Sequence, residues 1–222
     1  MEKELCFTSL FSDGCSIAHA LLSEHAYPWE ALDHIGEIIA ALIPTLPREE
    51  YEERTPGVWV ARTAKIAASA YIGAPCIICA GAEIRHGAFI RGTAIVGRDA
   101  VVGNSVELKN CILYDGAQVP HFNYVGDSIL GHRAHMGAGA VTSNVKGDKT
   151  LVSVRLPGGR IETGRKKFGA MLGDYAEIGC NCVLNPGTVI GRRTQVYPLS
   201  SVRGFVPAES IYKAANNIVK KH

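Results

Sequence analysis

The chain has 222 residues, and 47% of them are hydrophobic, which is enough to bury the core of one large domain with appendages. The formal net charge is only +2, which argues against a nucleic-acid-binding protein that relies on a basic surface. The N-terminal MEKELCFTSLF lacks the apolar run of a signal peptide, and no stretch reaches the roughly 20 apolar residues that span a bilayer. The seven cysteines therefore indicate reduced thiols, and we expect a cytoplasmic protein without a membrane partner.

Residues 1–55 show helical rather than strand periodicity. Apolar residues recur at helical spacing at Trp29, Leu32, Ile35, Ile39, Leu42 and Ile43. Pro28 suits a first helical position, and Pro44 is expected to stop the run. We therefore predict an N-terminal helical segment that caps or braces the domain that follows, or that lies at a subunit interface.

Residues 56–205 carry an internal repeat of six residues. Nine successive steps land on an aliphatic side chain: Val60, Ile66, Ile72, Ile78, Ile84, Ile90, Val96, Val102 and Leu108. The position two before each aliphatic is usually small, as at Ala82, Ala88 and Ala94. The repeat slips after Leu108, slips again near Leu130, and returns between Leu172 and Val202.

This period predicts strands, because six is a multiple of the strand period of two and does not fit the helical period of 3.6. A branched aliphatic fills the interior, and a small residue fits where the chain bends. Short strands joined by tight bends then wind into a prism whose coils stack about 4.8 Å apart. Hexapeptide periodicity is typical of a parallel β-helix, so we predict an all-β domain over residues 56–205.

Two segments depart from this repeat. Residues 142–169 are polar, basic and interrupted by Gly147, Pro157, Gly158, Gly159 and Gly164, which predicts a loop or hairpin thrown out of the coil. Residues 206–222 place Ile211, Ala215 and Ile218 on one helical face, and Lys220 and Lys221 suit a helix C-terminus, which predicts a C-terminal helix.

The stretch from Val106 to Asn144 carries a motif, PHFNYVGDS, at Pro120 to Ser128. With GGRIETGRKKFGAMLGD at Gly158 to Asp174, it resembles the acetyltransferase domain of bifunctional N-acetylglucosamine-1-phosphate uridyltransferases. It looks closer still to the β-helix domain of archaeal sugar-1-phosphate nucleotidylyltransferases that acetylate amino sugars. The resemblance covers roughly residues 56–205. It implies a left-handed coil, a homotrimer with sites between neighbours, and acetyl-CoA as co-substrate.

The resemblance also implies roles for individual residues. His121 matches the general base, and Arg91 and Lys109 match a basic pair that holds the sugar phosphate. Tyr124 and Asn144 match residues that contact the sugar and organise the site, and Lys149 matches a further basic residue in a loosely aligned loop. The turn made by Gly137, Ala138 and Gly139 would admit the coenzyme A arm.

The chemistry of these residue types agrees with acyl transfer. An amine must be uncharged to attack a thioester, and a neutral imidazole with an unperturbed pKa of about 6.5 accepts its proton. Such a base contributes roughly 10²- to 10⁴-fold to a rate. Arginine offers a phosphate a bidentate fork, and lysine offers it a compact charge. The scheme requires no metal. We predict an N-acetyltransferase for glucosamine 1-phosphate or galactosamine 1-phosphate, in the synthesis of nucleotide sugars such as UDP-N-acetylglucosamine.

Each of these residues also has an ordinary structural interpretation. His121, Arg91 and Lys109 could be solvated surface groups, Tyr124 could pack against a neighbouring coil or subunit, and Asn144 could shape a turn. The bacterial bifunctional enzymes carry an asparagine where this chain has His135, and residues 1–55 are too short for a nucleotidylyltransferase domain, so we expect no uridylyl transfer. A non-catalytic β-helix module for assembly or regulation is the alternative function.

The spacing of the cysteines and histidines does not indicate a metal site. Cys76 of the CxxC formed with Cys79 occupies a small inward position of the repeat, as does Cys182, which favours core packing. His121, His132 and His135 do not have the spacing of the three-histidine zinc site of β-helix carbonic anhydrases.

Overall fold

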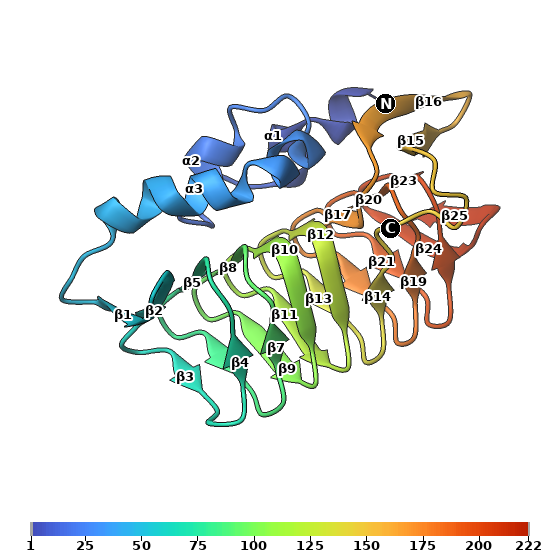
Figure 1. Cartoon of the computed structure of the whole chain (residues 1–222). Helices are drawn as coiled ribbons and strands as arrows, with labels where there is room; N and C mark the ends of the chain where they lie inside the picture. The colour runs from blue at the N-terminus through green and yellow to red at the C-terminus, as the bar shows by residue number, and fades with distance from the viewer. Residues whose placement is uncertain (1, 222) are drawn as a thin grey trace.

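The computed structural model describes residues 2–221 and shows a coiled β-structure with a helical segment on one side (Figure 1). Two columns of parallel strands belong to a 14-stranded sheet and the third to a nine-stranded sheet. The parallel β-helix predicted from the hexads is thus confirmed, and its left-handed sense stays an expectation from the resemblance.

The first column of strands faces the N-terminal segment. It contains β2 (Val58–Ala61), β5 (Cys76–Ile78), β8 (Ala94–Val96), the second halves of β10 (Glu107–Leu113) and β12 (Tyr124–Leu130), β17 (Ala170–Leu172), β20 (Thr188–Ile190) and β23 (Phe205–Val206). The antiparallel strand β1 (Tyr51–Thr55) pairs with β2 and protects its edge.

The other two columns complete the prism. The nine-stranded sheet contains β3 (Lys65–Ile66), β6 (Glu83–Ile84), β9 (Val101–Asn104), β11 (Gln118–His121), β13 (His135–Met136), β18 (Glu177–Ile178), β21 (Gln195–Val196), β24 (Ser210–Ala214) and β25 (Asn217–Lys220). The third column contains β4 (Tyr71–Ile72), β7 (Phe89–Ile90), the first halves of β10 and β12, β14 (Val141–Thr142), β19 (Val183–Leu184) and β22 (Ser201–Val202).

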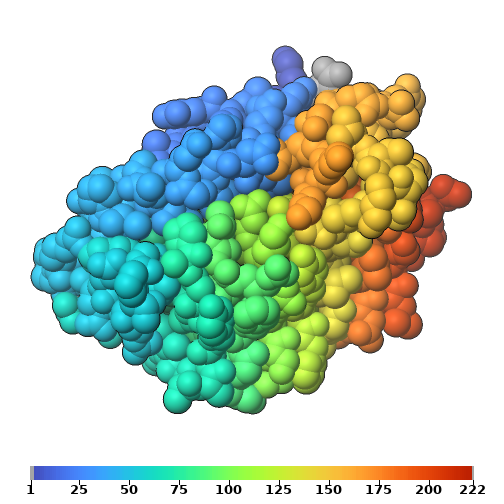
Figure 2. Space-filling view, viewed as in Figure 1, coloured from blue at the N-terminus to red at the C-terminus, as the bar shows by residue number. Residues whose placement is uncertain are grey.

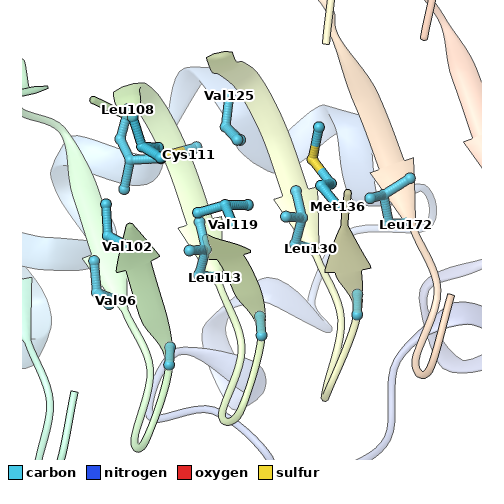
Figure 3. Packing of buried hydrophobic residues seen from close by; sticks show 14 of the residues in the cluster. Val96, Val102, Leu108, Cys111, Leu113, Val119, Val125, Leu130, Met136 and Leu172 are labelled. Atoms are coloured by element: carbon cyan, nitrogen blue, oxygen red, sulfur yellow. The ribbon is translucent and has the colours of Figure 1, made fainter. Parts of the chain in front are cut away.

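The interior of the prism is filled by the aliphatic residues of the repeat. Val96, Val102 and Leu108 are fully buried, and Figure 3 shows them and their successors pointing into the space enclosed by the strands. Cys76 and Cys182 are also buried, which confirms the packing interpretation of these thiols. Burial raises the pKa of the Cys79 thiol to about 12, so this sulfur stays protonated and unreactive.

The slips of the repeat correspond to shorter coils. Cys76 pairs with Ala94 eighteen residues later, whereas Ala94 pairs with Cys111 and Cys111 with Ser128, seventeen residues later in each case. Asn110 and Asp127 occupy the shortened corners, with φ angles of 49° and 48°. Asparagine and aspartate tolerate this left-handed conformation better than most residues, so the corner can lose one residue there.

The predicted helical segment over residues 1–55 is helical only in short pieces up to Thr45, and its last residues form the strand β1 (Tyr51–Thr55), which pairs with β2. The helical pieces are the 3-10 helix η1 (Glu2–Leu5), α1 (Phe7–Leu10), α2 (His19–Leu22), the 3-10 helix η2 (Pro28–Asp33), α3 (Ile35–Leu42) and the 3-10 helix η3 (Ile43–Thr45). The segment braces one side of the coil, where it packs against the outer surface of the first column (Figure 2). None of the described helices is long and apolar enough to cross a membrane.

The predicted insertion is an antiparallel hairpin of β15 (Val152–Leu156) and β16 (Gly159–Arg165), on the same side of the coil as the N-terminal helices (Figure 1). Its ends close where the Phe168 amide donates to the Asn144 carbonyl oxygen at 3.0 Å. The guanidinium of Arg165 reaches the Asp33 carboxylate at 2.5 and 2.6 Å, which ties the hairpin to the N-terminal segment.

The predicted helix over residues 206–222 is wrong. β24 and β25 form an antiparallel hairpin instead, and Tyr212 pairs with Val196 and takes an interior position of the last coil. The residues of β25 are exposed, so this strand contributes backbone hydrogen bonds rather than apolar burial. β25 provides backbone hydrogen-bond partners for β24 in the final coil, whose edge would otherwise be open.

Candidate active site

The shortened corners bring polar residues together around one buried carboxylate. Asp127 is 3% exposed, and its oxygens lie 3.2 and 3.1 Å from the Lys109 ammonium nitrogen. The side-chain amide of Asn110 donates to the same carboxylate at 2.9 Å, and that of Asn144 donates to its second oxygen. Lys109, Asn110, Asp127 and Asn144 are called the corner cluster below.

Tyr124 joins the corner cluster through Asn144, whose amide donates to the tyrosine hydroxyl at 3.2 Å. Burial raises the pKa of Tyr124 above its ordinary value, and the negative charges of Asp127 and Glu107 raise it further. The phenol therefore remains protonated at neutral pH and can still donate a hydrogen bond.

Arg91 lies one coil before Lys109 on the same row. The amide of Arg91 donates to the carbonyl of Leu108, which aligns the two cationic residues, and its guanidinium pairs with Glu107 at 2.9 Å. The arginine and glutamate side chains are 48% and 34% exposed, so this ion pair is accessible to a competing anion.

His121 precedes β12, whereas Asp127 lies in the middle of that strand. The histidine ends β11, its side chain is exposed, and no contact joins the imidazole to the corner cluster among the residues the structure describes. Its backbone is fixed, because its amide donates to Asn123 Oδ1 at 3.1 Å and the Asn123 amide donates to the carbonyls of Gly137 and Ala140.

Lys149 is exposed in the loop that leads into the hairpin, with a φ of 59°. Within residues 2–221, no contact connects its side chain with the corner cluster. Of the predicted phosphate and sugar residues, the structure therefore joins Lys109, Tyr124 and Asn144, places Arg91 on the adjacent coil, and leaves Lys149 apart.

The glycines at 137 and 139 are required by the neighbouring coil. A Cβ atom on Gly137 would lie 2.7 Å from the Cys180 amide nitrogen. Gly139 has a φ of 72°, and a Cβ atom there would clash with Asn181 Oδ1. Tight stacking of coils thus explains both glycines, independently of any ligand.

A separate hollow of 620 Å³ opens on the outer surface of the nine-stranded sheet around Gln118, Arg133, His135, Tyr175 and Glu177. His135 pairs there with Glu177 at 2.9 Å. Three or more His, Cys, Asp or Glu side chains do not gather into a metal-binding group anywhere in residues 2–221.

Sequence reasoning missed three members of this arrangement: Asp127, Asn110 and Asn123. A signal for two of them was present, because both slips of the hexad repeat fall at Asn110 and Asp127. A missing residue in a regular solenoid marks a corner with unusual geometry. Asn123 lies inside the PHFNYVGDS motif but gives no periodic signal.

Known proteins with similar sequences match about half of the chain. The family model described as the GMPPB C-terminal domain matches residues 72–156. The bifunctional sugar-1-phosphate nucleotidylyltransferase/acetyltransferase of Sulfurisphaera tokodaii is 36% identical over 109 residues, which is 49% of this chain and 27% of that protein. The bifunctional protein GlmU of Methanococcus vannielii is 33% identical over 118 residues, which is 53% of this chain and 28% of that protein.

Among solved structures, a mutant of AntD, an N-acyltransferase from Bacillus cereus in complex with dTDP and coenzyme A, is 17% identical. The match covers 74% of this chain and 81% of that chain, with a TM-score of 0.34. This chain spans little more than a quarter of the length of the two curated relatives. The resemblance seen in the sequence is confirmed at this level: about half of the chain is homologous to part of the bifunctional sugar-1-phosphate nucleotidylyltransferase/acetyltransferases.

Proposed function

We propose that this protein is an acetyl-CoA-dependent N-acetyltransferase whose acceptor is an amino-sugar 1-phosphate, glucosamine 1-phosphate or galactosamine 1-phosphate. The observation that carries the proposal is the corner cluster. Of three residues selected by resemblance alone, Lys109 and Asn144 contact one buried carboxylate and Tyr124 contacts Asn144, although the three are up to 35 positions apart in the sequence.

The sugar phosphate is held by Lys109 and Arg91 in this proposal. The Arg91–Glu107 pair is half-exposed, and exposed pairs contribute about 0–1 kcal/mol, so a phosphate can take the place of Glu107 at little cost. Lys109 has three N–H donors and can bind a phosphate while it stays beside Asp127.

His121 is the proposed general base. The sugar amine attacks the thioester carbonyl carbon of acetyl-CoA, a C–N bond forms, and the C–S bond breaks. The imidazole accepts the proton that the nitrogen loses and returns it to the leaving thiolate, so coenzyme A departs as a thiol. The proposed place for the coenzyme A arm is the turn at Gly137, Ala138 and Gly139. The Gly137 carbonyl accepts from the side-chain amide of Asn123, whose Oδ1 accepts from the His121 amide.

We further propose that the chain works as a cytoplasmic homotrimer. The exposed His121 side chain is compatible with a site completed by a neighbouring copy, as the resemblance implies. Analytical ultracentrifugation measures this directly, and a monomer that is fully active at assay concentration would contradict it.

A non-catalytic assembly module remains the second candidate. The specific observation in its favour is that both proposed phosphate ligands already have carboxylate partners, Lys109 with Asp127 and Arg91 with Glu107. Under this alternative the ion pairs only stabilise the coil, and no acceptor is bound.

Release of coenzyme A thiol from acetyl-CoA separates the two candidates. We expect turnover with glucosamine 1-phosphate or galactosamine 1-phosphate, and a rate about 10²- to 10⁴-fold lower in His121→Ala. His86→Ala is the matched control, because His86 is also an exposed corner histidine of the coil. Circular dichroism checks that both variants are folded. No turnover with any amino-sugar phosphate or nucleotide-linked amino sugar, in a folded protein, would favour the assembly module.

A further inference from the structure

Asp127 has more hydrogen-bond donors directed at it than a corner residue needs. It is buried, its carboxylate contacts Lys109, Asn110 and Asn144, and its carbonyl oxygen accepts from the Gly169 amide at 2.8 Å. These donors come from the previous coil, from the start of the hairpin insertion and from its end. A buried carboxylate is stable in such a place only because a cation and hydrogen bonds compensate its charge.

The carboxylate also determines where its partners point. Lys109 has a long flexible side chain, and holding its ammonium in one place costs up to about 2 kcal/mol of rotamer freedom unless a partner fixes it. Asn144 presents its amide to Asp127 and to the Tyr124 hydroxyl together. The positions of a cation, an amide and a phenol therefore all depend on one carboxylate.

We infer that Asp127 is a positioning residue, which aims Lys109 at the phosphate and Asn144 and Tyr124 at the sugar without touching the acceptor itself. This inference rests on the proposed function. Asn110 extends the arrangement, because its side-chain amide donates both to Asp127 and to the Leu32 carbonyl at 3.0 Å. The N-terminal segment is thereby connected to the proposed acceptor site.

Asp127→Asn is the sharpest variant, since asparagine has the same shape and tolerates the φ of 48°. It removes the counter-charge of Lys109 and turns one oxygen into an N–H₂ group that faces other donors. We expect the KM for the sugar 1-phosphate to rise about 10- to 100-fold, the range for losing one hydrogen bond to a charged group. The KM for acetyl-CoA should stay within about twofold, because the carboxylate contacts the corner cluster rather than the turn at 137–139.

Asp99→Asn is the matched control. Asp99 also occupies a coil corner with a φ of 54°, but it is exposed and lies in a different row of corners. It should leave both KM values unchanged. A general loss of fold would lower the melting temperature and affect both substrates, whereas lost positioning affects the phosphate substrate alone.

A double-mutant cycle with Lys109→Met tests the mechanism. If Asp127 acts on the phosphate through Lys109, Asp127→Asn should raise the KM for the sugar phosphate less in the Lys109→Met background, because the ammonium that it aims is then absent and only Asn144 and Tyr124 remain to be positioned. Additive effects of the two substitutions would overturn the inference, as would an unchanged KM in a folded Asp127→Asn protein.

If Asp127→Asn does not fold, Asn110→Gly takes its place. Glycine accepts the φ of 49° and removes only the bonds to Asp127 and Leu32. We then expect a smaller rise in the KM for the sugar phosphate, about threefold to tenfold, because Asn110 supports the Asp127 carboxylate and leaves its charge beside Lys109. An unchanged KM would overturn the inference. Absence of turnover in the unmodified protein would remove the proposed function and this inference together, whereas normal turnover in the variants removes the inference only.

Discussion

Two outer faces of the same coil have opposite environments. The face of the first column presents a ladder of apolar residues that are fully buried under the N-terminal segment: Ile77, Ile95, Ile112, Ile129, Met171 and Val189. The face of the nine-stranded sheet presents Lys65, Glu83, Gln118, His135, Glu177 and Gln195 to solvent. The inward-facing positions are equally aliphatic on both faces, so the repeat specifies the coil alone. The outward-facing residues determine which face of the coil the N-terminal segment covers.

The comparison also concerns the candidate site. Asn110 lies at the border of the covered face, where it contacts Leu32, and Arg165 of the hairpin contacts Asp33 in the next position of the N-terminal segment. The N-terminal segment therefore contacts the corner cluster, whereas it leaves the solvated face uncovered. Substitutions that weaken the packing of the N-terminal segment on the coil test this difference.

The largest effect is expected from Ile112→Ala. Ile112 lies in the middle of the apolar ladder between Ile95 and Ile129, and its loss should lower the free energy of unfolding by about 2–5 kcal/mol, through lost burial and a cavity. Val101→Ala on the solvated face is the control and should cost less than about 1 kcal/mol. Urea unfolding followed by circular dichroism measures both. Equal losses would show that the N-terminal segment adds nothing to the stability of the covered face.

A second effect is expected from Asp174→Ala at the edge of the covered face. Asp174 is 1% exposed and accepts from the amides of Ser12 at 2.8 Å and His132 at 2.9 Å. Its removal leaves these donors unpaired and should cost about 1–3 kcal/mol. Hydrogen exchange should quicken in residues 7–22 before it does in the coil.

Glu177→Ala is the counterpart on the solvated face, where the partly exposed pair with His135 predicts a loss of about 0–1 kcal/mol. If the two variants were equally stable, the contact between Asp174 and the N-terminal segment would not stabilise the packing of that segment on the coil.

The smallest effect is expected from Glu83→Gln on the solvated face. Hydrogen bonding to Arg85 lowers the pKa of Glu83 in the folded state, so its ionised form stabilises the fold above the pKa of the unfolded chain. This stability is lost as the pH falls through the lowered folded-state pKa. Because the pair is partly exposed, the difference between Glu83→Gln and the parent should be at most about 0.5 kcal/mol at pH 7 and should disappear in acid. Thermal unfolding at both pH values measures it, and a difference that grows in acid would contradict the assignment.

The structure explains which interpretations of the sequence succeeded. The hexads predicted the interior because i and i+6 positions are related by local geometry. The outward ladder was also visible in runs such as Cys76-Ile77-Ile78 and Ala94-Ile95-Val96, where consecutive apolar residues indicate a strand buried on both faces. The terminal helix failed because Ile211, Ala215 and Ile218 match helical spacing, whereas the preceding coil offered an open edge that a strand could pair with.

The sequence by itself determined the coil, the helical character of the segment before β1 and the set of residues that the resemblance marked for chemistry. Only the tertiary structure decided which of them meet. Lys109, Asp127 and Asn144 lie on successive coils, and their approach depends on coils shortened by one residue and on the closed ends of the hairpin insertion. Asn110 and Leu32 are 78 positions apart, and their contact depends on which outer face the N-terminal segment covers. Such contacts depend on how distant segments stack, and the local periodicity of a sequence does not predict this stacking.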